Sequence, residues 1–287
     1  MPGDELRQFA AQHVPGTGPC AIQRWGGGLV NETFRVLRAG AVYALRVVAA
    51  NPYNLGVDRD WEAQVLTAAA AADLAPLVEY FDAKRGILIT RWEAGQSWSA
   101  ADTRRPTNIR RMAELLQRIH RLPVPTPGRL MSPAKWIDCY SVGVSAGAGE
   151  ALRSVASLQL AVLAQLPAVD PVLCHSDLHT LNMIDRGGSL ILLDWEYAHV
   201  SDPLWDLAGW SVNNDLQESL QHDLLRSYLM RSPNDSEYLR LRLLGWLYDY
   251  ICLLWSELYL KSTGDGRAAG RAQLLIERLT HQSSRAP

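Results

Sequence analysis

The sequence predicts an α+β protein with a small antiparallel β-rich N-terminal lobe and a larger, mostly helical C-terminal lobe. Residues 21–92 form short runs of β-branched, aromatic and alternating residues separated by turn residues, which is typical of antiparallel strands. Beyond residue 95 the apolar residues recur at helical spacing, and residues 203–282 are helical in pattern and rich in tryptophan. We therefore divide the 287 residues into an N-terminal lobe over 1–95 and a C-terminal lobe over 96–287.

The N-terminal lobe is expected to hold a small sheet that carries one helix. The alanine run 68–72 favours a helix, and Asn51-Pro52 ends the strand that precedes it. The expected elements are two strands within 21–40, a strand over 41–49, a helix over about 58–73, and strands over 77–83 and 86–92.

The C-terminal lobe begins with apolar residues spaced three and four apart in 107–121, which indicates an amphipathic helix. The proline-rich run 122–130 is expected to be a loop. Further elements are a helix over 149–166, short strands over 181–185 and 189–195, and helices from about 203 to 282. Because ligands favour the cleft between two such lobes, we expect the functional site there.

Composition and charge disfavour several classes of protein. The net charge of −2 offers no basic field for nucleic acid. The four cysteines are scattered without a C-x-x-C pair, which is typical of reduced thiols. The N-terminal residues lack the apolar core of a signal peptide, and no run of 18 apolar residues occurs. We expect a cytoplasmic monomer or homodimer that binds neither nucleic acid nor a membrane.

The segment LCHSDLHTLNMI (173–184) concentrates residues that can carry chemistry. His175, Asp177 and His179 are spaced like zinc ligands, which would indicate a metallohydrolase. A catalytic zinc site needs three protein ligands, and the other histidines form no second cluster. The zinc hypothesis therefore depends on this segment alone.

The same segment also fits phosphoryl transfer. His175, Asp177 and Asn182 reproduce the H-x-D-x4-N spacing of protein-kinase catalytic loops, including a leucine directly after the aspartate. In those loops the aspartate orients the attacking hydroxyl and the asparagine holds a metal ion. A second metal ligand must come from a facing strand, and the apolar strand LILLD ends in Asp194, across a Gly187-Gly188 hairpin. This combination is much more specific than H-x-D alone.

Most of the chain, about residues 20–260, resembles the aminoglycoside phosphotransferase and choline kinase family, which has a protein-kinase-like fold. The pair DWEYA and DPLWDLA within 192–209 is the most specific feature and looks particularly like bacterial choline kinases, with thiamine kinases close behind. The matching segments are GGGLVNETFRV (26–36), YALRV (43–47), the helix with Glu62, LQRIHRLP (116–123), CHSDLHTLN (174–182) and LLDWEYAHVSDPLWDLAG (192–209). The resemblance implies a bilobal kinase-like fold that uses ATP and Mg²⁺.

The resemblance also implies roles around the catalytic loop. Asp177 would be the catalytic base, and Asn182 and Asp194 would be the Mg²⁺ ligands. His175 would brace the loop through packing and hydrogen bonds. Asp206 would brace it as well, with a role at a helix N-terminus as the alternative. His179 has no role that the family implies.

On the nucleotide side, Gly27, Gly28 and Asn31 resemble the GG-x-x-N loop of the family, in which backbone N–H groups approach phosphates. By itself a glycine turn is equally typical of a plain hairpin. The connector 89–95 would be the hinge that offers backbone groups to adenine, with Thr90 and Trp92 beside the nucleotide.

Arg46 stands where protein kinases place a lysine, and this resembles many choline and thiamine kinases. Arginine remains charged and can grip a phosphate with two donors, although its geometry differs from that of lysine. Its expected partner is Glu62 on the following helix. The alternative is a surface arginine on an exposed strand.

The acceptor is expected to be a small alcohol held by aromatic side chains with acidic neighbours, an arrangement that suits a cation. Positions that match choline-kinase segments point to Glu196, Trp205 and Trp255 as substrate contacts. Choline is the favoured acceptor, thiamine is the near alternative, and other aminoglycoside-phosphotransferase-like kinases follow. A non-catalytic kinase-like binding module is the alternative from another class, although the chain retains the base, the metal ligands and the clamp cation.

Overall fold

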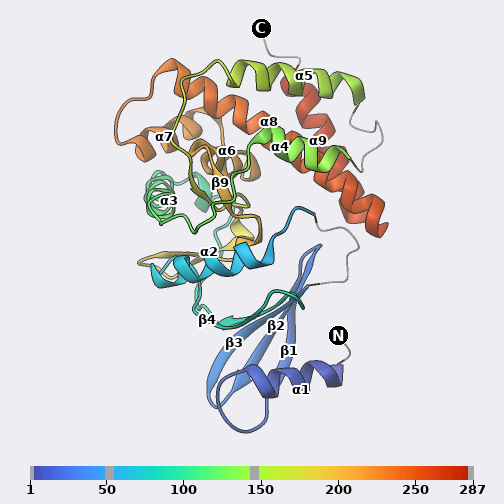
Figure 1. Cartoon of the computed structure of the whole chain (residues 1–287). Coiled ribbons are helices and arrows are strands. Elements are labelled where there is room, and N and C mark those ends of the chain that lie inside the picture. Colours follow the sequence, from blue (N-terminus) through green and yellow to red (C-terminus); the bar gives the residue numbers. More distant parts are fainter. Residues whose placement is uncertain (1–2, 49–54, 143–148, 284–287) are drawn as a thin grey trace.

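The computed structural model describes residues 3–48, 55–142 and 149–283, and it divides into a sheet-containing lobe and a helical lobe (Figure 1). The N-terminal sheet lies at one end of the molecule, the helical lobe at the other, and helix α2 lies between them. The predicted bilobal α+β architecture is therefore confirmed. The exact division at residue 95 stays a prediction.

The N-terminal sheet is antiparallel throughout, with strand order β1-β2-β3-β5-β4. Helix α1 packs on it through Leu6, Phe9 and Ala10, which join a small core with Leu45 and Ile89. The sequence analysis did not predict α1, since its three buried residues give too short a pattern. The strands are β1 Ala21–Gly27, β2 Asn31–Arg38, β3 Ala41–Val48, β4 Val78–Asp82 and β5 Ile87–Arg91, and α1 spans Gly3–His13. The break expected at Asn51-Pro52 lies outside the described residues.

Helix α2 (Arg59–Ala71) connects the two lobes. Asp58 caps it by accepting a hydrogen bond from the Trp61 backbone N–H at 3.0 Å, as capping asparagine and aspartate residues commonly do. The Trp61 indole N–H donates to the Ala198 carbonyl at 2.7 Å, which ties the helix to the C-terminal lobe. The buried face of α2 also carries Glu62 toward the cavity between the lobes.

The helical lobe is organised around α8 (Asp235–Thr263), which is buried along most of its length. Asn234 and Glu237 form a reciprocal capping box at its start. Helices α6, α4 and α9 pack against it, and Figure 1 shows α5 across the top of the lobe. The other helices are α3 Pro106–Ile119, α4 Pro133–Ser141, α5 Gly149–Leu163, α6 Leu204–Asn213, α7 Glu218–Leu229 and α9 Gly266–Ser283.

Short strands position the catalytic loop within this lobe. They form two two-stranded ladders, β6 with β9 and β7 with β8. Their bounds are β6 Val172–Cys174, β7 Met183–Asp185, β8 Leu190–Leu192 and β9 His199–Ser201. The strand expected over 181–185 begins as a 3₁₀ turn at Thr180–Asn182, and the strand expected over 189–195 ends at Leu192. The sequence analysis missed β6, β9 and α4, because three-residue strands carry no period and α4 follows a proline-rich run.

The connector between the lobes is fixed at Asp185. The backbones of Gln96 and Asp185 exchange two hydrogen bonds of 3.1 and 2.8 Å. A side chain at Gly95, whose φ is 157°, would collide with the Asp185 carbonyl, so this approach requires glycine. Arg111 binds the Asp185 carboxylate through two hydrogen bonds, and the pKa of that carboxyl falls to about 2. The connector thus keeps a fixed position against the helical lobe.

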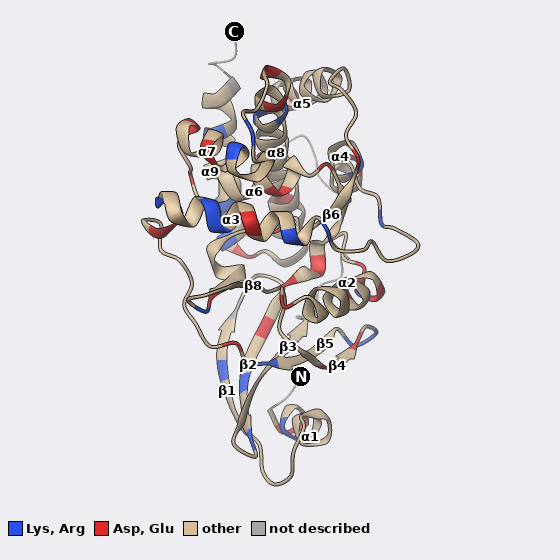
Figure 2. Cartoon of the chain, turned by 90° about the vertical axis from the view of Figure 1, so that its left-hand side faces the viewer, with Lys and Arg blue, Asp and Glu red and all other residues tan. Residues whose placement is uncertain are grey.

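Charge is mixed over both lobes: acidic and basic positions are interspersed from β1 to α7 in Figure 2. Within the described part of the chain, none of the helices combines the length and apolar character needed to cross a bilayer.

Candidate active site

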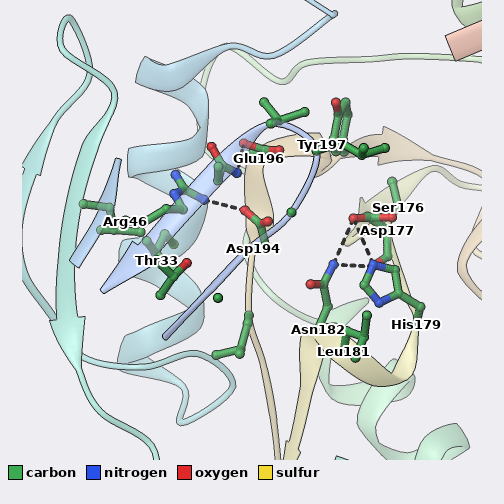
Figure 3. A pocket seen from close by; sticks show the side chains of 18 of the residues that line it. Thr33, Arg46, Ser176, Asp177, His179, Leu181, Asn182, Asp194, Glu196 and Tyr197 are labelled. Atoms are coloured by element: carbon green, nitrogen blue, oxygen red, sulfur yellow. Dashed lines mark hydrogen bonds and ion pairs between the residues drawn. The ribbon is translucent and has the colours of Figure 1, made fainter. Parts of the chain in front are cut away.

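A cavity of roughly 700 Å³ lies between the lobes. The glycine-rich loop, β3 and β5 line it from one side, and the catalytic loop, α8 and α9 line it from the other. Figure 3 shows Arg46, Asp194 and Glu196 grouped on one side, with Asp177, Asn182 and His179 facing them. Every catalytic, metal and substrate residue that the sequence predicted, namely Asp177, Asn182, Asp194, Glu196, Trp205 and Trp255, lines this single cavity.

The imidazole of His175 is committed to the backbone of the catalytic loop. Its Nε2 lies 2.9 Å from the Leu193 carbonyl oxygen, so this nitrogen carries the proton. Its Nδ1 accepts the backbone N–H of Asp177 at 3.3 Å, and its ring packs edge-on against Trp195 at 4.7 Å between centroids. With both nitrogens occupied, His175 is unavailable to zinc, which removes the basis of the metallohydrolase hypothesis.

Asp206, at the start of α6, holds the turn before the catalytic aspartate. Its two carboxylate oxygens accept the backbone N–H groups of His175 at 2.9 Å and Ser176 at 2.8 Å. Ser176 has a φ of 70°, a left-handed conformation that costs about 1–2 kcal/mol outside glycine. His120 adds a contact of 3.2 Å to the same carboxylate. Asp206 therefore supports the loop by holding the backbone of Ser176, the strained residue directly before Asp177.

Asp177 has its carboxylate held from one side only. Its Oδ2 accepts the amide N–H of Asn182 at 2.9 Å and lies 3.6 Å from the Nε2 of His179, an ion-pair distance. Burial by itself would raise the pKa of Asp177, but His179, His175 and Arg271 outweigh it and lower the pKa below its usual value. Asp177 is therefore an ionised carboxylate at neutral pH, with Oδ1 available to a ligand.

Asn182 and Asp194 offer oxygen atoms toward the same space. The Asn182 amide nitrogen donates to both the carboxylate and the carbonyl of Asp177, which leaves its side-chain oxygen for another partner. Asp194 sits in a left-handed conformation with φ of 59° directly after β8, and its side chain is 27% exposed to the cavity. Amide and carboxylate oxygens are suitable ligands for Mg²⁺. These two residues therefore fit the expected metal site.

A buried network of arginines and carboxylates lies on the β3 and α2 side of the cavity. Arg46 contacts both Glu62 and Asp194, so its expected pairing with Glu62 is present. Arg59 bridges Glu62 at 2.6 Å and Glu196 at 2.8 Å. The sequence analysis missed Arg59, although its position three residues before Glu62 on one helix was a signal.

Glu196 belongs to this network. Its carboxylate accepts the Asn31 side-chain N–H at 3.0 Å as well as Arg59. Burial raises the pKa of Glu196 to about 7, with Asp194 adding to the rise and Arg46 and Arg59 opposing it. Glu196 was expected to supply negative charge to the acceptor, but the structure commits it to the β2 and α2 side instead. Through these contacts, Glu196 links Asn31, at the end of the glycine-rich loop, to Arg59 and its partner Glu62.

Comparisons with known proteins decide the family. Residues 21–244 match the model of the phosphotransferase enzyme family. The chain belongs to this family. The match spans the glycine-rich loop, the clamp arginine, the catalytic loop and Asp194, and it ends within α8.

Relatives of this chain include Protein LicA of Haemophilus influenzae, which is 26% identical over 208 residues. That alignment covers 70% of this chain and 61% of the relative, so the chain spans about three fifths of the relative's length. The structure of a choline/ethanolamine kinase family protein from Mesorhizobium loti is 27% identical, with a TM-score of 0.79 over 98% of this chain and 94% of that one.

Two more distant structures share the fold. Choline kinase LicA from Streptococcus pneumoniae has a TM-score of 0.79 at 21% identity, covering 97% of this chain and 98% of that one. Aminoglycoside phosphotransferase APH(4)-Ia, in a complex with ADP and hygromycin B, has a TM-score of 0.67 at 16% identity, covering 95% and 98%. The predicted family and its kinase-like fold are both confirmed.

The glycine-rich loop of this family member lines the cavity. Gly27 ends β1, and the Gly28 backbone N–H donates to the Asn31 carbonyl at 2.9 Å, closing the turn. A Cβ atom added to Gly28 would lie 4.0 Å from its nearest neighbour, the Asn31 carbonyl oxygen, so nothing crowds the loop. The Tyr259 hydroxyl donates to the Leu29 carbonyl and ties the loop to α8.

The hinge side of the cavity contains Thr90 and Trp92, as the sequence predicted. The backbone N–H of Trp92 is taken by the Val42 carbonyl at 3.1 Å and that of Arg91 by the Leu77 carbonyl at 2.8 Å. Trp25 packs edge-on against Trp92 at 4.8 Å between centroids and remains 58% exposed at the cavity mouth. Trp25 is a cavity residue that the sequence analysis did not identify.

An aromatic wall forms the other end of the cavity, beside Asp177. Trp205 packs against Tyr248 at 5.1 Å between centroids, and the Trp255 indole N–H donates to the Tyr197 hydroxyl at 2.9 Å. The wall consists of Trp136, Tyr140, Tyr197, Trp205, Tyr248 and Trp255. Trp136 and Tyr140 were missed because they lie on α4, a helix that the sequence did not predict.

Proposed function

We propose that this chain is an ATP-dependent kinase that transfers the γ-phosphoryl group to the hydroxyl of a small cationic alcohol, with choline as the favoured acceptor. The observation that carries the proposal is the convergence of Asp177, Asn182 and Asp194 in one cavity that continues into an aromatic wall. Membership of the phosphotransferase enzyme family supports phosphoryl transfer as the reaction. The solved LicA structure with AMP, which shares the fold, supports a nucleotide as the donor.

The nucleotide is proposed to enter between the glycine-rich loop and the hinge. The turn at Gly27 and Gly28, which lacks side chains, would lie against its phosphates, and Arg46 would turn from Asp194 toward them. Asn182 and Asp194 would hold Mg²⁺, which when bound bridges the phosphates and neutralises charge that develops during transfer. Glu62 and Arg59 would keep Arg46 aligned through the buried network.

Asp177 is proposed to orient the acceptor hydroxyl and accept its proton. Asn182 and His179 hold the Oδ2 atom, which directs Oδ1 toward the acceptor. The lowered pKa of Asp177 keeps it ionised at neutral pH, as a group that accepts a proton must be. In phosphoryl transfer of this kind, positioning of the hydroxyl contributes more than covalent chemistry.

The aromatic wall supports a cationic acceptor, because ring faces attract a quaternary ammonium group. Two solved structures that share the fold at a TM-score of 0.79 are described as a choline/ethanolamine kinase family protein and as choline kinase LicA. Thiamine is the alternative, since it is also a cation with a primary alcohol. The neighbour that binds hygromycin B keeps aminoglycosides among the acceptors to be tested.

A parallel turnover assay tests the proposal. ADP release is measured with choline, ethanolamine, thiamine and hygromycin B, each with Mg²⁺ and with EDTA. We expect the highest kcat/KM with choline and no turnover with EDTA. Tight ATP binding without turnover on any acceptor would instead support a non-catalytic binding module. Faster turnover of thiamine would move the acceptor assignment to thiamine.

A further inference from the structure

Arg271 brings a positive charge into the acceptor end of the cavity. It lies on α9, beyond the part of the chain that matches the family model, and it lines the cavity together with Asp177 and Trp255. Its guanidinium carbon lies 5.7 Å from the centre of the Trp255 ring, within the range of cation–π attraction. Burial would lower the pKa of Arg271, but Cys252, Tyr248 and Asp177 nearby outweigh it and raise the pKa. A cation of the protein therefore lies over a ring proposed to bind the cation of the substrate.

The ring itself is held firmly. Tyr259 stacks against Trp255 with 5.2 Å between centroids and 7° between planes. The Trp255 indole N–H is fixed by the Tyr197 hydroxyl at 2.9 Å. Trp255 thus presents a preorganised surface, and Arg271 is the group able to move.

Arg271 is held much more weakly than Arg278, which lies two turns further along the same helix. Arg278 contacts the Asp249 carboxylate at 2.5 Å and Asp215 at 3.2 Å. No carboxylate among the described residues lies within ion-pair distance of Arg271, which is partly exposed to solvent. An exposed cation–π contact is weak, so the Arg271 side chain can leave the ring at little cost.

Arg271 also sets the charge of this part of the cavity. Glu196 is paired with Arg59 and Asp249 with Arg278, which leaves Asp177 as the carboxylate that faces the acceptor. With Arg271 over Trp255, its charge opposes that of Asp177. When Arg271 swings away, the acceptor end loses one positive charge, which favours the binding of a cation.

We propose that Arg271 occupies the cation-binding face of Trp255 in the free protein and is displaced by the ammonium group of the acceptor. This inference rests on the proposed function in that it assigns a cationic acceptor to the aromatic wall. Arg271 then selects for ligands whose cation binds the ring better than its own guanidinium does. Uncharged alcohols gain less binding free energy when they displace the Arg271 guanidinium from the ring.

Direct binding of tetramethylammonium chloride, which cannot be phosphorylated, tests the inference apart from turnover. Calorimetric Kd values are compared at constant ionic strength for the wild type, Arg271→Gln, Arg271→Lys and Arg267→Gln. Arginine and glutamine have similar helix propensities, so α9 should be preserved. Arg267 is a matched control, because it lies on the same helix and pairs with Asp265.

We expect Arg271→Gln to bind tetramethylammonium about two- to five-fold more tightly than the wild type, the range that a weak cation–π contact corresponds to. Arg271→Lys and Arg267→Gln should stay within two-fold of the wild type. Unchanged or weaker binding by Arg271→Gln would overturn the inference, as would equal tightening in Arg271→Lys or no binding by any form. Tighter binding by Arg271→Gln in a protein that fails to phosphorylate choline would refute the proposed function and leave the inference standing.

Discussion

On the side of the cavity that faces β3 and α2, the carboxylates of Glu62, Asp194 and Glu196 each contact an arginine. On the side lined by α8 and α9, the surface is aromatic, Arg271 lies over the Trp255 ring, and no carboxylate of the described residues forms an ion pair with Arg271. The first side is fixed by buried polar contacts, each of which is costly to break. The second side is fixed by packing of rings, which tolerates different ligands. In the proposed function, the first side would position the reacting groups and the second would select the acceptor.

The largest effect is expected from Asp177→Asn, which lies where the two sides meet. The amide cannot accept the hydroxyl proton, so kcat should fall about 10²–10⁴-fold, equivalent to roughly 3–5 kcal/mol. Nucleotide affinity, measured by calorimetry with a non-hydrolysable ATP analogue, should change little. A near-normal kcat in Asp177→Asn would show that Asp177 takes no part in the chemical step. The two sides of the cavity would then have no catalytic group between them.

Glu196→Gln tests how firmly the polar side is buried. The pKa of Glu196 is raised to about 7 in the folded state. Between about pH 4.5 and 7, the Glu196 carboxyl therefore keeps its proton in the folded state but has lost it in the unfolded state. The stability of the wild type should therefore decrease as the pH rises through this window, by on the order of 3 kcal/mol relative to Glu196→Gln. Urea unfolding at pH 4.5, 6 and 8 measures the difference. If the free energies of unfolding of the two proteins changed equally with pH, Glu196 would be ionised in the folded state over the whole range.

Asp194→Asn removes one charge from the metal site and from the pair with Arg46. We expect the Mg²⁺ concentration for half-maximal activity to rise about 10–100-fold, as for the loss of interactions that support a metal. Titration of activity with Mg²⁺ at saturating ATP measures the shift. Asp73→Asn, a change at an exposed carboxylate paired with Arg186, is the control. An unchanged Mg²⁺ requirement in Asp194→Asn would assign the metal to other residues.

The smallest of these effects is expected from Trp255→Ala on the aromatic side. Loss of the ring should raise KM for choline about 5- to 30-fold, roughly 1–2 kcal/mol, and leave KM for ATP unchanged. Steady-state kinetics with each substrate varied in turn separates the two constants. A rise in KM for ATP alone would contradict the division of the cavity into two sides.

Much of the catalytic loop was predictable from the sequence, because its geometry is local. His175, Asp177 and Asn182 lie within eight residues, and Asp194 follows across a short hairpin, so their approach needs only a loop and a two-stranded ladder. The sheet was equally readable, since β1 to β5 are runs of β-branched, aromatic or alternating residues between turn residues. Helices α1 and α4 were missed because each depends on a few buried residues whose partners lie far away in the chain.

Motif spacing was enough to predict the family, the two-lobed architecture and the set of catalytic and metal-binding candidates, because these depend on short segments of the chain. Only the tertiary structure decided how the charges are paired. Asn31 and Arg59 reach Glu196 from 165 and 137 residues away, which moved Glu196 from the acceptor to the polar network. The packing of α9 on α8 likewise placed Arg271 over Trp255. Such contacts depend on side chains that packing brings together, and a linear pattern does not encode them.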